Sequence, residues 1–265
     1  MMTDLDQLEA QSIFVLREAY HRLRPLGLLW SLGKDSNVLL WLARKAFLGR
    51  VPVPVYHVDT GKKFPEMYAF RDRYAAEWGL DLRIGACPPV EEIDPTLPPA
   101  ARSAARKTAG LAAVIERDRL AGVVAGIRRD EQATRAKERV FSPRAASHRW
   151  DVRNQPPEFW DQFATPVEAG AHVRVHPLLA WRELDVWRYI EREGIPVVDL
   201  YFARDGWRYR SLGDQDITAP VASEARTILE ILAELRLTRE AERAGRAMDN
   251  ETEDAFERLR VAGYL

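Results

Sequence analysis

The chain has 265 residues, of which 46% are apolar and 9% aromatic, so it can bury a large core. Its 39 Lys and Arg side chains balance 40 Asp and Glu, and the resulting charge of −1 excludes binding of nucleic acid through a global basic field. The single cysteine, Cys87, excludes a disulfide framework, an iron–sulfur cluster and a Cys-rich zinc site. No stretch resembles a signal peptide or approaches the roughly 18 apolar residues of a membrane span, so we expect a soluble, cytoplasmic protein without a membrane or nucleic-acid partner.

The first half of the chain alternates short apolar runs with longer stretches of helical periodicity. This alternation is typical of a parallel sheet that helices cover on both faces. The five prolines between Pro88 and Pro99 predict an irregular loop. Helices are predicted over residues 5–22, 37–47, 65–78 and 104–119, and strands over 27–30, 53–58, 81–84 and 122–127.

The second half is more irregular. A fifth strand is predicted over residues 173–176, and helices over 183–193, 223–235 and 251–260. The pattern favours an α/β fold: an open, mostly parallel five-stranded sheet with helices on both faces. We expect one domain over residues 1–220 and a C-terminal helical or irregular extension over residues 221–265, packed on the same domain or on a partner.

A turn that can bind phosphate follows the first predicted strand. Gly33 permits a tight turn, the N–H groups at the start of the next helix point outward, and Ser31 and Ser36 add hydroxyl donors. Lys34 adds a positive charge, so pyrophosphate is a natural occupant. The segment is not a P-loop, because Asp35 follows Lys34 and no glycine stands five residues before Gly33. An ordinary strand-to-helix turn is the alternative.

Asp59 and Thr60 end the second predicted strand, at the edge where open α/β sheets bind ligands. Asp59 could bond a ribose, orient the phosphate-binding turn or hold a magnesium-bound water. Either residue could instead cap a helix.

A cluster of arginines follows the fourth predicted strand, beside the expected phosphate site. Planar guanidinium groups suit tetrahedral oxyanions through paired hydrogen bonds. If the segment after Asp130 is helical, Arg128, Arg135 and Arg139 share one face. The alternative is a solvated charged face, in which acidic residues of the same segment neutralise the arginines. The cluster comprises Arg128, Arg129, Arg135, Lys137, Arg139 and Arg144.

These segments together resemble a known family. The turn is similar to the Ser-Gly-Gly-x-Asp-Ser loop of the PP-loop ATP pyrophosphatases, with Leu32 in place of the first glycine. In order and spacing, the whole chain resembles the small, catalytic subunits of bacterial heterodimeric sulfate adenylyltransferases. The strings that carry the resemblance are Gly33-Lys34-Asp35-Ser36, His57-Val58-Asp59-Thr60-Gly61, Arg128-Arg129-Asp130-Glu131, Arg135-Ala136-Lys137-Glu138-Arg139, Trp181-x-Glu183-Leu184-Asp185-Val186-Trp187 and Arg210-Ser211-Leu212-Gly213.

The resemblance implies an adenine nucleotide α-hydrolase-like fold and adenylyl transfer from ATP to sulfate, which gives adenylyl sulfate and pyrophosphate in sulfate assimilation and cysteine biosynthesis. It implies ATP as substrate, Mg²⁺ on the phosphates without protein metal ligands, and a GTPase large subunit as partner. The implied catalytic residues are Lys34, Arg128 and Arg129. The implied ATP- and pyrophosphate-binding residues are Ser31, Gly33, Lys34, Asp35, Ser36, Asp59 and Thr60, and the sulfate-binding residues are Arg128, Arg129, Arg135, Arg139 and Arg210.

One departure from the family leaves other functions open. Asp214 and Asp216 stand where the family has a Cys-aromatic-Pro turn, so the chain could adenylylate another oxyanion or a carboxylic acid. A nucleotide-binding regulatory subunit without turnover is a further alternative. Adenylyl-sulfate reductases and tRNA-thiolating enzymes are disfavoured because they need cysteines that the chain lacks.

Two segments are predicted to dock the partner subunit: the charged tail after Thr238 and the stretch Trp150–Gln162, with Trp150, Phe159 and Trp160. Packing of these aromatic residues on the chain's own sheet is the alternative, and it is the expectation for Trp160.

Overall fold

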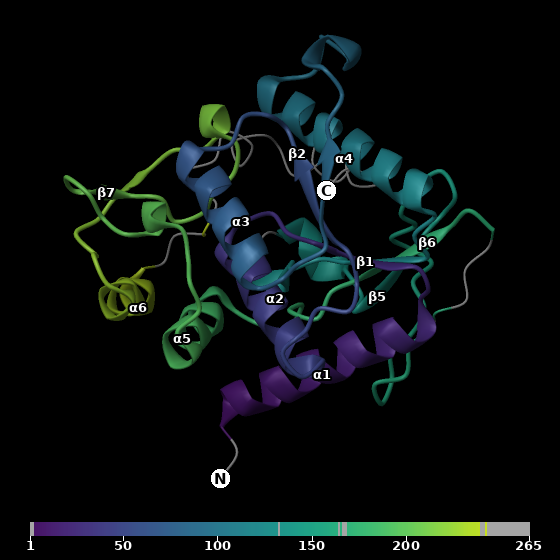
Figure 1. Cartoon of the computed structure of the whole chain (residues 1–265), viewed down its shortest axis with the longest axis horizontal. Helices are drawn as coiled ribbons and strands as arrows, with labels where there is room; N and C mark the ends of the chain where they lie inside the picture. Colours follow the sequence, from purple (N-terminus) through teal and green to yellow (C-terminus); the bar gives the residue numbers. More distant parts are fainter. Residues whose placement is uncertain (1–2, 132, 164, 166–168, 239–241, 243–265) are drawn as a thin grey trace.

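Among the residues that the computed structural model describes (3–131, 133–163, 165, 169–238 and 242), six strands form one sheet in the order β3-β2-β1-β4-β6-β5 (Figure 1). Neighbouring strands are parallel except β5, which runs antiparallel to β6. A short antiparallel pair, β7 and β8, lies outside the sheet. The strands are β1 (Leu26–Leu29), β2 (Val55–Asp59), β3 (Leu82–Ala86), β4 (Gly122–Val124), β5 (Phe141–Arg144), β6 (His172–Val175), β7 (Trp207–Arg208) and β8 (Val221–Ala222).

Helices cover both faces of the sheet, as the sequence predicts. The main core lies under α1, α2, α3 and α5, and a second cluster joins α4 to the opposite face. No helix in the described part of the chain has the length and apolar character needed to cross a membrane. The helices are α1 (Asp4–Arg22), α2 (Lys34–Ala46), α3 (Pro65–Glu77), α4 (Pro99–Asp118), α5 (Glu183–Glu193) and α6 (Ile228–Leu237), which packs on α5.

The two cores follow from the alternation of side chains along each strand. Leu28 of β1 belongs to the core under α1 and α2, whereas Leu29 packs toward α4. In β4, Val124 belongs to the core under α1 and α2, and Val123 to the cluster under α4. Strands buried on both faces contain almost only apolar residues, which explains why the sequence shows short apolar runs rather than alternation.

The predicted fold class is confirmed, but in the described part of the chain the main sheet has six strands and not five. The sequence pattern misses β5 because Pro143 and Arg144 occupy half of this four-residue strand. Proline is tolerated there because β5 is the last strand of the sheet and has no ladder to form on its outer side.

The structure differs from the sequence reasoning at one segment considered as a possible helix and at the start of one predicted helix. The segment after Asp130 forms two short 3₁₀ turns, Arg129–Glu131 and Ala133–Lys137, so its arginines do not share one face of an α-helix. Helix α6 begins at Ile228, where Thr227 caps it, rather than at residue 223. The helix predicted over residues 251–260 lies outside the described residues.

The order of the strands determines where a ligand can bind. From β1 the chain proceeds to β2 and β3 on one side, and it returns to β4 on the other side of β1. Neighbouring loops therefore diverge at the carboxyl ends of β1 and β4, and open α/β sheets bind their ligands at such a switch point. The segments that start at Ser31 and Ala125 lie there.

Candidate active site

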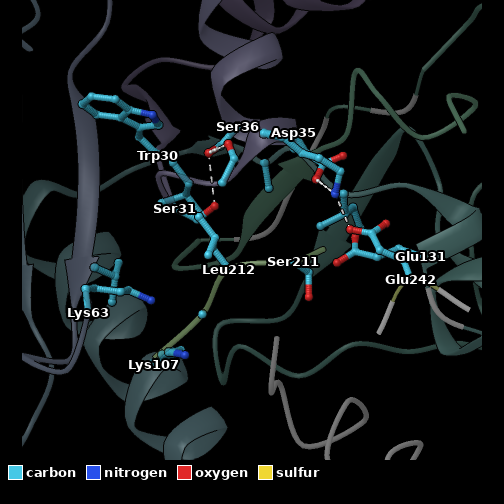
Figure 2. A pocket seen from close by; sticks show the side chains of 18 of the residues that line it. Trp30, Ser31, Asp35, Ser36, Lys63, Lys107, Glu131, Ser211, Leu212 and Glu242 are labelled. Atoms are coloured by element: carbon cyan, nitrogen blue, oxygen red, sulfur yellow. Dashed lines mark hydrogen bonds and ion pairs between the residues drawn. The ribbon is translucent and has the colours of Figure 1, made fainter. Parts of the chain in front are cut away.

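A cavity opens at the carboxyl ends of β1 and β4 (Figure 2). Its walls come from the turn between β1 and α2, the end of β2, the first half of α4, the segment after β4 and the loop before β8. The structure thus brings together segments that are far apart in the sequence, and the predicted phosphate-binding turn forms one wall.

The turn reverses direction at Leu32, which has a left-handed backbone (φ of 68°) and is fully buried. Gly33 has an ordinary extended backbone (φ of −79°) and serves as the N-cap of α2. The expectation that Gly33 makes the tight turn is therefore wrong. The related loops have their first glycine at the position of Leu32, where the left-handed conformation makes glycine favourable.

Hydrogen bonds order the turn from within. Ser31 Oγ donates to Ser36 Oγ over 3.1 Å, and Ser36 Oγ lies 2.9 Å from the carbonyl oxygen of Gly33. The backbone N–H of Lys34 donates to the hydroxyl of Tyr201 over 2.9 Å. The loop conformation is thus fixed before any ligand arrives, which lowers the entropic cost of binding an anion.

Gly126 allows β4 to approach the first turn of α2. A Cβ atom at this position would lie 3.2 Å from the carbonyl oxygen of Asp35 and 3.3 Å from the backbone nitrogen of Ser36. These contacts are with backbone atoms, which cannot easily move aside. The absence of a side chain at Gly126 therefore keeps the segment after β4 close to the phosphate-binding turn.

Two buried cations and three carboxylates form a network at the polar end of the cavity. Lys34, Asp35 and Glu242 line the cavity, whereas Arg128 and Asp130 join the network without lining it. Arg128 is fully buried, and Lys34 is 1% exposed. The Nζ atom of Lys34 lies 3.3 Å from the carboxylate of Asp35 and also contacts Glu242. Arg128 pairs with Asp35, with Glu242 and, over 2.9 Å, with Asp130. Each cation is therefore already neutralised by side chains of the same chain.

The electrostatic balance keeps Glu242 and Arg128 ionised. Burial raises the pKa of Glu242, but Lys34 and Arg128 outweigh burial, so that the pKa lies well below its usual range. Burial alone would lower the pKa of Arg128. The surrounding carboxylates, Glu242 above all, outweigh burial and raise this pKa above its usual value. The polar end is thus a network of buried full charges in which a ligand anion can replace a carboxylate.

Of the other four predicted arginines, one lines the cavity and three do not. Arg135 lines it and pairs with Glu131. Arg129 is exposed and its guanidinium donates to the carbonyl oxygen of Glu138. Arg139 donates to the carbonyl oxygen of Pro156, and Arg210 pairs with Glu183 over 2.7 Å; neither lines the cavity.

Asp59 and Thr60 lie at the end of β2 but do not line the cavity. The carboxylate of Asp59 accepts hydrogen bonds of 2.8 Å from the N–H of Gly61 and from the hydroxyl of Tyr68. Thr60 donates to the carboxylate of Asp214 over 2.8 Å. Both side chains therefore organise the loop after β2.

Asp214 and Asp216 do not present free negative charge to the cavity. Asp214 is fully buried between Lys63 and Lys107, both of which line the cavity. Asp216 forms a surface ion pair with Lys62. The two carboxylates that distinguish this chain in sequence are each neutralised by lysine.

No group of three or more His, Cys, Asp or Glu side chains in the described residues is arranged to hold a metal ion. Asp35 and Glu242, the carboxylates nearest the turn, are both paired with cations. The side chains around the turn therefore suit a negatively charged ligand better than a resident metal ion.

Comparison with known proteins identifies the family. Residues 25–220 match the phosphoadenosine phosphosulfate reductase domain family. The chain is 43% identical to sulfate adenylyltransferase subunit 2 of Xanthomonas oryzae pv. oryzae, an alignment that covers all of this chain and 98% of the relative. It is 44% identical to the Xylella fastidiosa protein of that name, covering 98% of this chain and 97% of the relative. The chain belongs to the sulfate adenylyltransferase subunit 2 family.

Solved structures share the fold of this family member. The FMN adenylyltransferase of Candida glabrata superposes with a TM-score of 0.56 over 90% of this chain and 74% of its own, at 16% identity. The phosphoadenylyl-sulfate reductase of Candida auris superposes with a TM-score of 0.54 over 83% of this chain and 98% of its own, at 18% identity. The resemblance predicted from the sequence is confirmed.

Several residues that surround the cavity were not predicted from the sequence. Lys63 follows the carboxyl end of β2 by four residues, which is a usable signal for a ligand-facing cation. Ser103, Lys107 and Tyr201 lie in a helix and a turn remote from the strand ends, and no local pattern marks them. Glu242 reaches Lys34 from 208 positions along the chain, so only the folded structure reveals it.

Proposed function

We propose that the chain is the catalytic subunit that transfers the adenylyl group of ATP to sulfate, producing adenylyl sulfate and pyrophosphate. The observation that carries the proposal is the phosphate-binding turn at the switch point, with Lys34 and Arg128 beside it, in a chain of this family. Positive charge and oriented hydrogen-bond donors at this place suit a triphosphate.

The reaction needs positioning and charge stabilisation rather than a general base. A sulfate oxygen attacks the α-phosphorus, a new P–O bond to sulfate forms, and the bond to the β-phosphate oxygen breaks, so that pyrophosphate leaves. Sulfate is a dianion and has no proton to lose. Lys34 and the donors of the turn stabilise the charge that develops on pyrophosphate, and this interaction is strongest in the transition state.

The arginines beside the turn bind the oxyanions. Arg128 and Arg135 are our candidates for binding sulfate. Arg128 pairs with Glu242, which also pairs with Lys34, and Arg135 lines the cavity. An anion that reaches Lys34 and Arg128 takes the place of the Glu242 carboxylate. Magnesium enters as the complex with ATP, since the phosphates supply the oxygen ligands that it prefers.

The alternative of a different acceptor rests on Asp214 and Asp216. Since lysines neutralise both carboxylates, neither repels sulfate or selects a positively charged acid. We therefore retain sulfate as the acceptor.

A partner subunit supplies the driving force. The relatives carry the name subunit 2, which implies a further subunit. The phosphate–sulfate anhydride is of higher energy than the bond broken in ATP, so the reaction is strongly uphill and a catalyst alone cannot shift its equilibrium. We propose that this partner is a GTPase large subunit whose hydrolysis of GTP drives the yield.

Phe159 and Trp160 are our candidates for the docking surface. They are 64% and 90% exposed, so the expectation that Trp160 packs on the chain's own sheet is wrong. Trp150 instead is buried, with the guanidinium of Arg144 5.1 Å from its ring. The charged tail after Thr238 lies outside the described residues, except for Glu242.

The test measures pyrophosphate release from ATP across a panel of anions, with and without a GTPase large subunit from a relative. Release that depends on sulfate or its analogues supports the proposal, and release only with an organic acid contradicts it. With the partner, we expect adenylyl sulfate to accumulate in proportion to GTP hydrolysed. A high yield from the isolated chain, without removal of pyrophosphate, would contradict the coupling.

A further inference from the structure

The first residue of α5, Glu183, contacts two segments that shape the candidate active site. Its backbone N–H donates to Oδ2 of Asp130 over 2.8 Å, in the segment after β4. Its carboxylate accepts from Arg210, in the loop before β8, with Nη2 2.7 Å from Oε2 and Nε 3.2 Å from Oε1. Neither Asp130 nor Glu183 is among the described residues that line the cavity. We name Asp130, Glu183 and Arg210 the α5 bridge.

At one end of the α5 bridge, Asp130 fixes the direction of the Arg128 guanidinium. Oδ1 of Asp130 accepts a hydrogen bond of 2.9 Å from Nε of Arg128, whose side chain is fully buried. The guanidinium is planar, so a fixed Nε–H also determines where both Nη atoms point. These two atoms contact Asp35 and Glu242. Asp130 therefore aims the side of Arg128 that we expect to meet an oxyanion.

Of the carboxylates around Arg128, Asp130 is the one with an anchor on α5. Its second oxygen is bound to the N–H of Glu183, which is the first N–H of the helix and has no partner within it. The positive end of the helix dipole favours a carboxylate at this place. Glu242 instead directs its two oxygens to Lys34 and Arg128. A ligand anion therefore replaces Glu242 and leaves Asp130 in position.

At the other end of the α5 bridge, Glu183 holds the start of one cavity wall. The side chains of Glu183 and Arg210 are 9% and 12% exposed, so their ion pair is largely shielded from water. Two nitrogen atoms of Arg210 bind the carboxylate, which fixes the arginine more firmly than a single contact would. Residues 211–213 follow directly and line the cavity, where Figure 2 shows Ser211 and Leu212.

Helix α5 is a suitable fixed reference for these contacts. It packs against α2 and α6, and Trp187 in its middle is fully buried in the main core. The ring of Trp187 stands at 87° to that of Tyr201, with centroids 5.4 Å apart, and Tyr201 accepts the N–H of Lys34. One helix thus holds the phosphate-binding turn, the guanidinium of Arg128 and the wall after Arg210 in a common frame.

We propose that Asp130 and Glu183 are positioning residues for adenylyl transfer. Asp130 aims Arg128 at the oxyanion, and Glu183 holds Arg210 so that the residues after it keep their place in the wall. The inference rests on the proposed function, since it requires Arg128 to contact a reacting anion. A shift of about 1 Å at a reacting group can cost on the order of 10²-fold in rate, so residues outside the cavity can control turnover.

The first experiment is a double-mutant cycle of Asp130→Asn with Arg128→Ala. Asparagine has one acceptor oxygen, so its amide nitrogen would face a donor, either Nε of Arg128 or the N–H of Glu183. We expect Asp130→Asn to lower kcat/KM for sulfate about tenfold, and to change it less than about twofold when Arg128 is already alanine. Pyrophosphate release against sulfate concentration measures both. Equal factors in the two backgrounds would show that Asp130 does not act through Arg128.

The second experiment is a cycle of Glu183→Met with Arg210→Met. Each single variant leaves a shielded charge without its partner, whereas the double variant removes both charges. We expect each single variant to lose about tenfold in kcat/KM for sulfate, and the double variant to be more active than either. A double variant no better than Arg210→Met would make Arg210 a direct ligand of sulfate and would overturn the role of Glu183.

Glu191→Met is the matched control, because Glu191 is exposed on the same helix, and it should retain the wild-type kcat/KM. Unfolding temperatures are recorded for every variant. Losses of activity that follow the losses in unfolding temperature across the whole set would make the α5 bridge purely structural and would overturn the inference.

Binding of inorganic pyrophosphate tests the α5 bridge without turnover. Calorimetric dissociation constants repeat the cycle of Asp130→Asn with Arg128→Ala, and we expect the same lack of additivity. Additive effects on binding would contradict the positioning role whether or not the chain turns over. If the wild type instead releases no pyrophosphate from ATP with sulfate, the proposed function fails, and the binding cycle still decides the role of Asp130.

Discussion

The hydroxyl of Tyr201 accepts a hydrogen bond of 2.9 Å from the backbone N–H of Lys34. The two residues lie 167 positions apart, and Tyr201 is 1% exposed. The first N–H group of α2 is thereby satisfied by the protein itself, so a phosphate at the turn has to bind through the remaining donors and the Lys34 side chain. Tyr201, which fixes the phosphate-binding turn, follows the six strands of the main sheet in the sequence. The conformation of the turn therefore depends on the fold of the whole domain.

Replacing Tyr201 with Phe should therefore destabilise the fold. The buried N–H of Lys34 loses its acceptor, and we expect the free energy of unfolding in urea to fall by about 1–3 kcal/mol. Tyr209→Phe is the control, since within the described residues the Tyr209 hydroxyl makes no hydrogen bond. An equal loss in the two variants would show that the Tyr201 hydroxyl does not support the turn.

Lys34→Ala should lower turnover far more than it weakens binding of ATP. The ammonium charge meets pyrophosphate most strongly as the bond breaks, and we expect kcat to fall on the order of 10²–10³-fold. Steady-state pyrophosphate release measures this loss. Lys45→Ala, which removes a lysine from the last turn of the same helix, should retain activity because Lys45 pairs with Glu9 and Glu193 outside the cavity. Turnover at the wild-type rate in Lys34→Ala would rule out the role of the turn.

Arg128→Lys should impair sulfate use nearly as much as Arg128→Ala. The planar guanidinium contacts Asp35, Asp130 and Glu242 at once, and a single ammonium group cannot reproduce this fork. Sulfate saturation curves measure the effect, with the unfolding temperature recorded alongside. Arg129→Ala is the comparison, and we expect a smaller effect because its guanidinium is exposed and bound to a carbonyl oxygen. Superimposable curves for the wild type and both Arg128 variants would remove Arg128 from the anion site.

The two adjacent arginines illustrate what a sequence can and cannot predict. Apolar runs and turns gave the order of helices and strands, and strand ends correctly pointed to the cavity, because burial and chain reversal leave local signals. The direction of a side chain after a strand leaves no such signal. Arg128 points inward and Arg129 outward, and Asp59 turns to Gly61 and Tyr68 rather than to the cavity. These outcomes depend on partners that only the tertiary structure supplies.

Leu32→Gly should destabilise the protein although glycine suits the backbone better. The left-handed conformation costs leucine about 1–2 kcal/mol, whereas removal of a fully buried leucine side chain costs about 2–5 kcal/mol. We expect a net loss of about 1–3 kcal/mol in the free energy of unfolding. Leu48 is the matched control, because it has the same left-handed backbone (φ of 56°) and is 92% exposed. Leu48→Gly should leave stability unchanged or raise it slightly, and equal effects at the two positions would contradict the account.

His172→Phe should reduce the loss of stability in acid. His172 is fully buried, and neither ring nitrogen has a hydrogen-bond partner among the described residues. Burial, followed by the charge of Arg174, lowers its pKa from 6.5 to about 3, so the folded protein holds the ring neutral. The unfolded chain takes up this proton near pH 6.5, and stability that is present above pH 6.5 is therefore lost as the pH falls toward 3.

At pH 4.5 this single group should reduce the free energy of unfolding by roughly 2–3 kcal/mol relative to pH 7. Phenylalanine retains an aromatic ring of similar size and cannot be protonated, so the variant should lose less stability over this range. At pH 7 the variant should be at least as stable as the wild type, because position 172 then buries no ring nitrogen without a hydrogen-bond partner. Urea unfolding at pH 7, 5.5 and 4.5 measures the difference. His21→Gln, at an exposed position in the last turn of α1, is the control and should follow the wild type. If His172→Phe and the wild type lose stability in parallel between pH 7 and pH 4.5, His172 is not the group that couples protonation to unfolding.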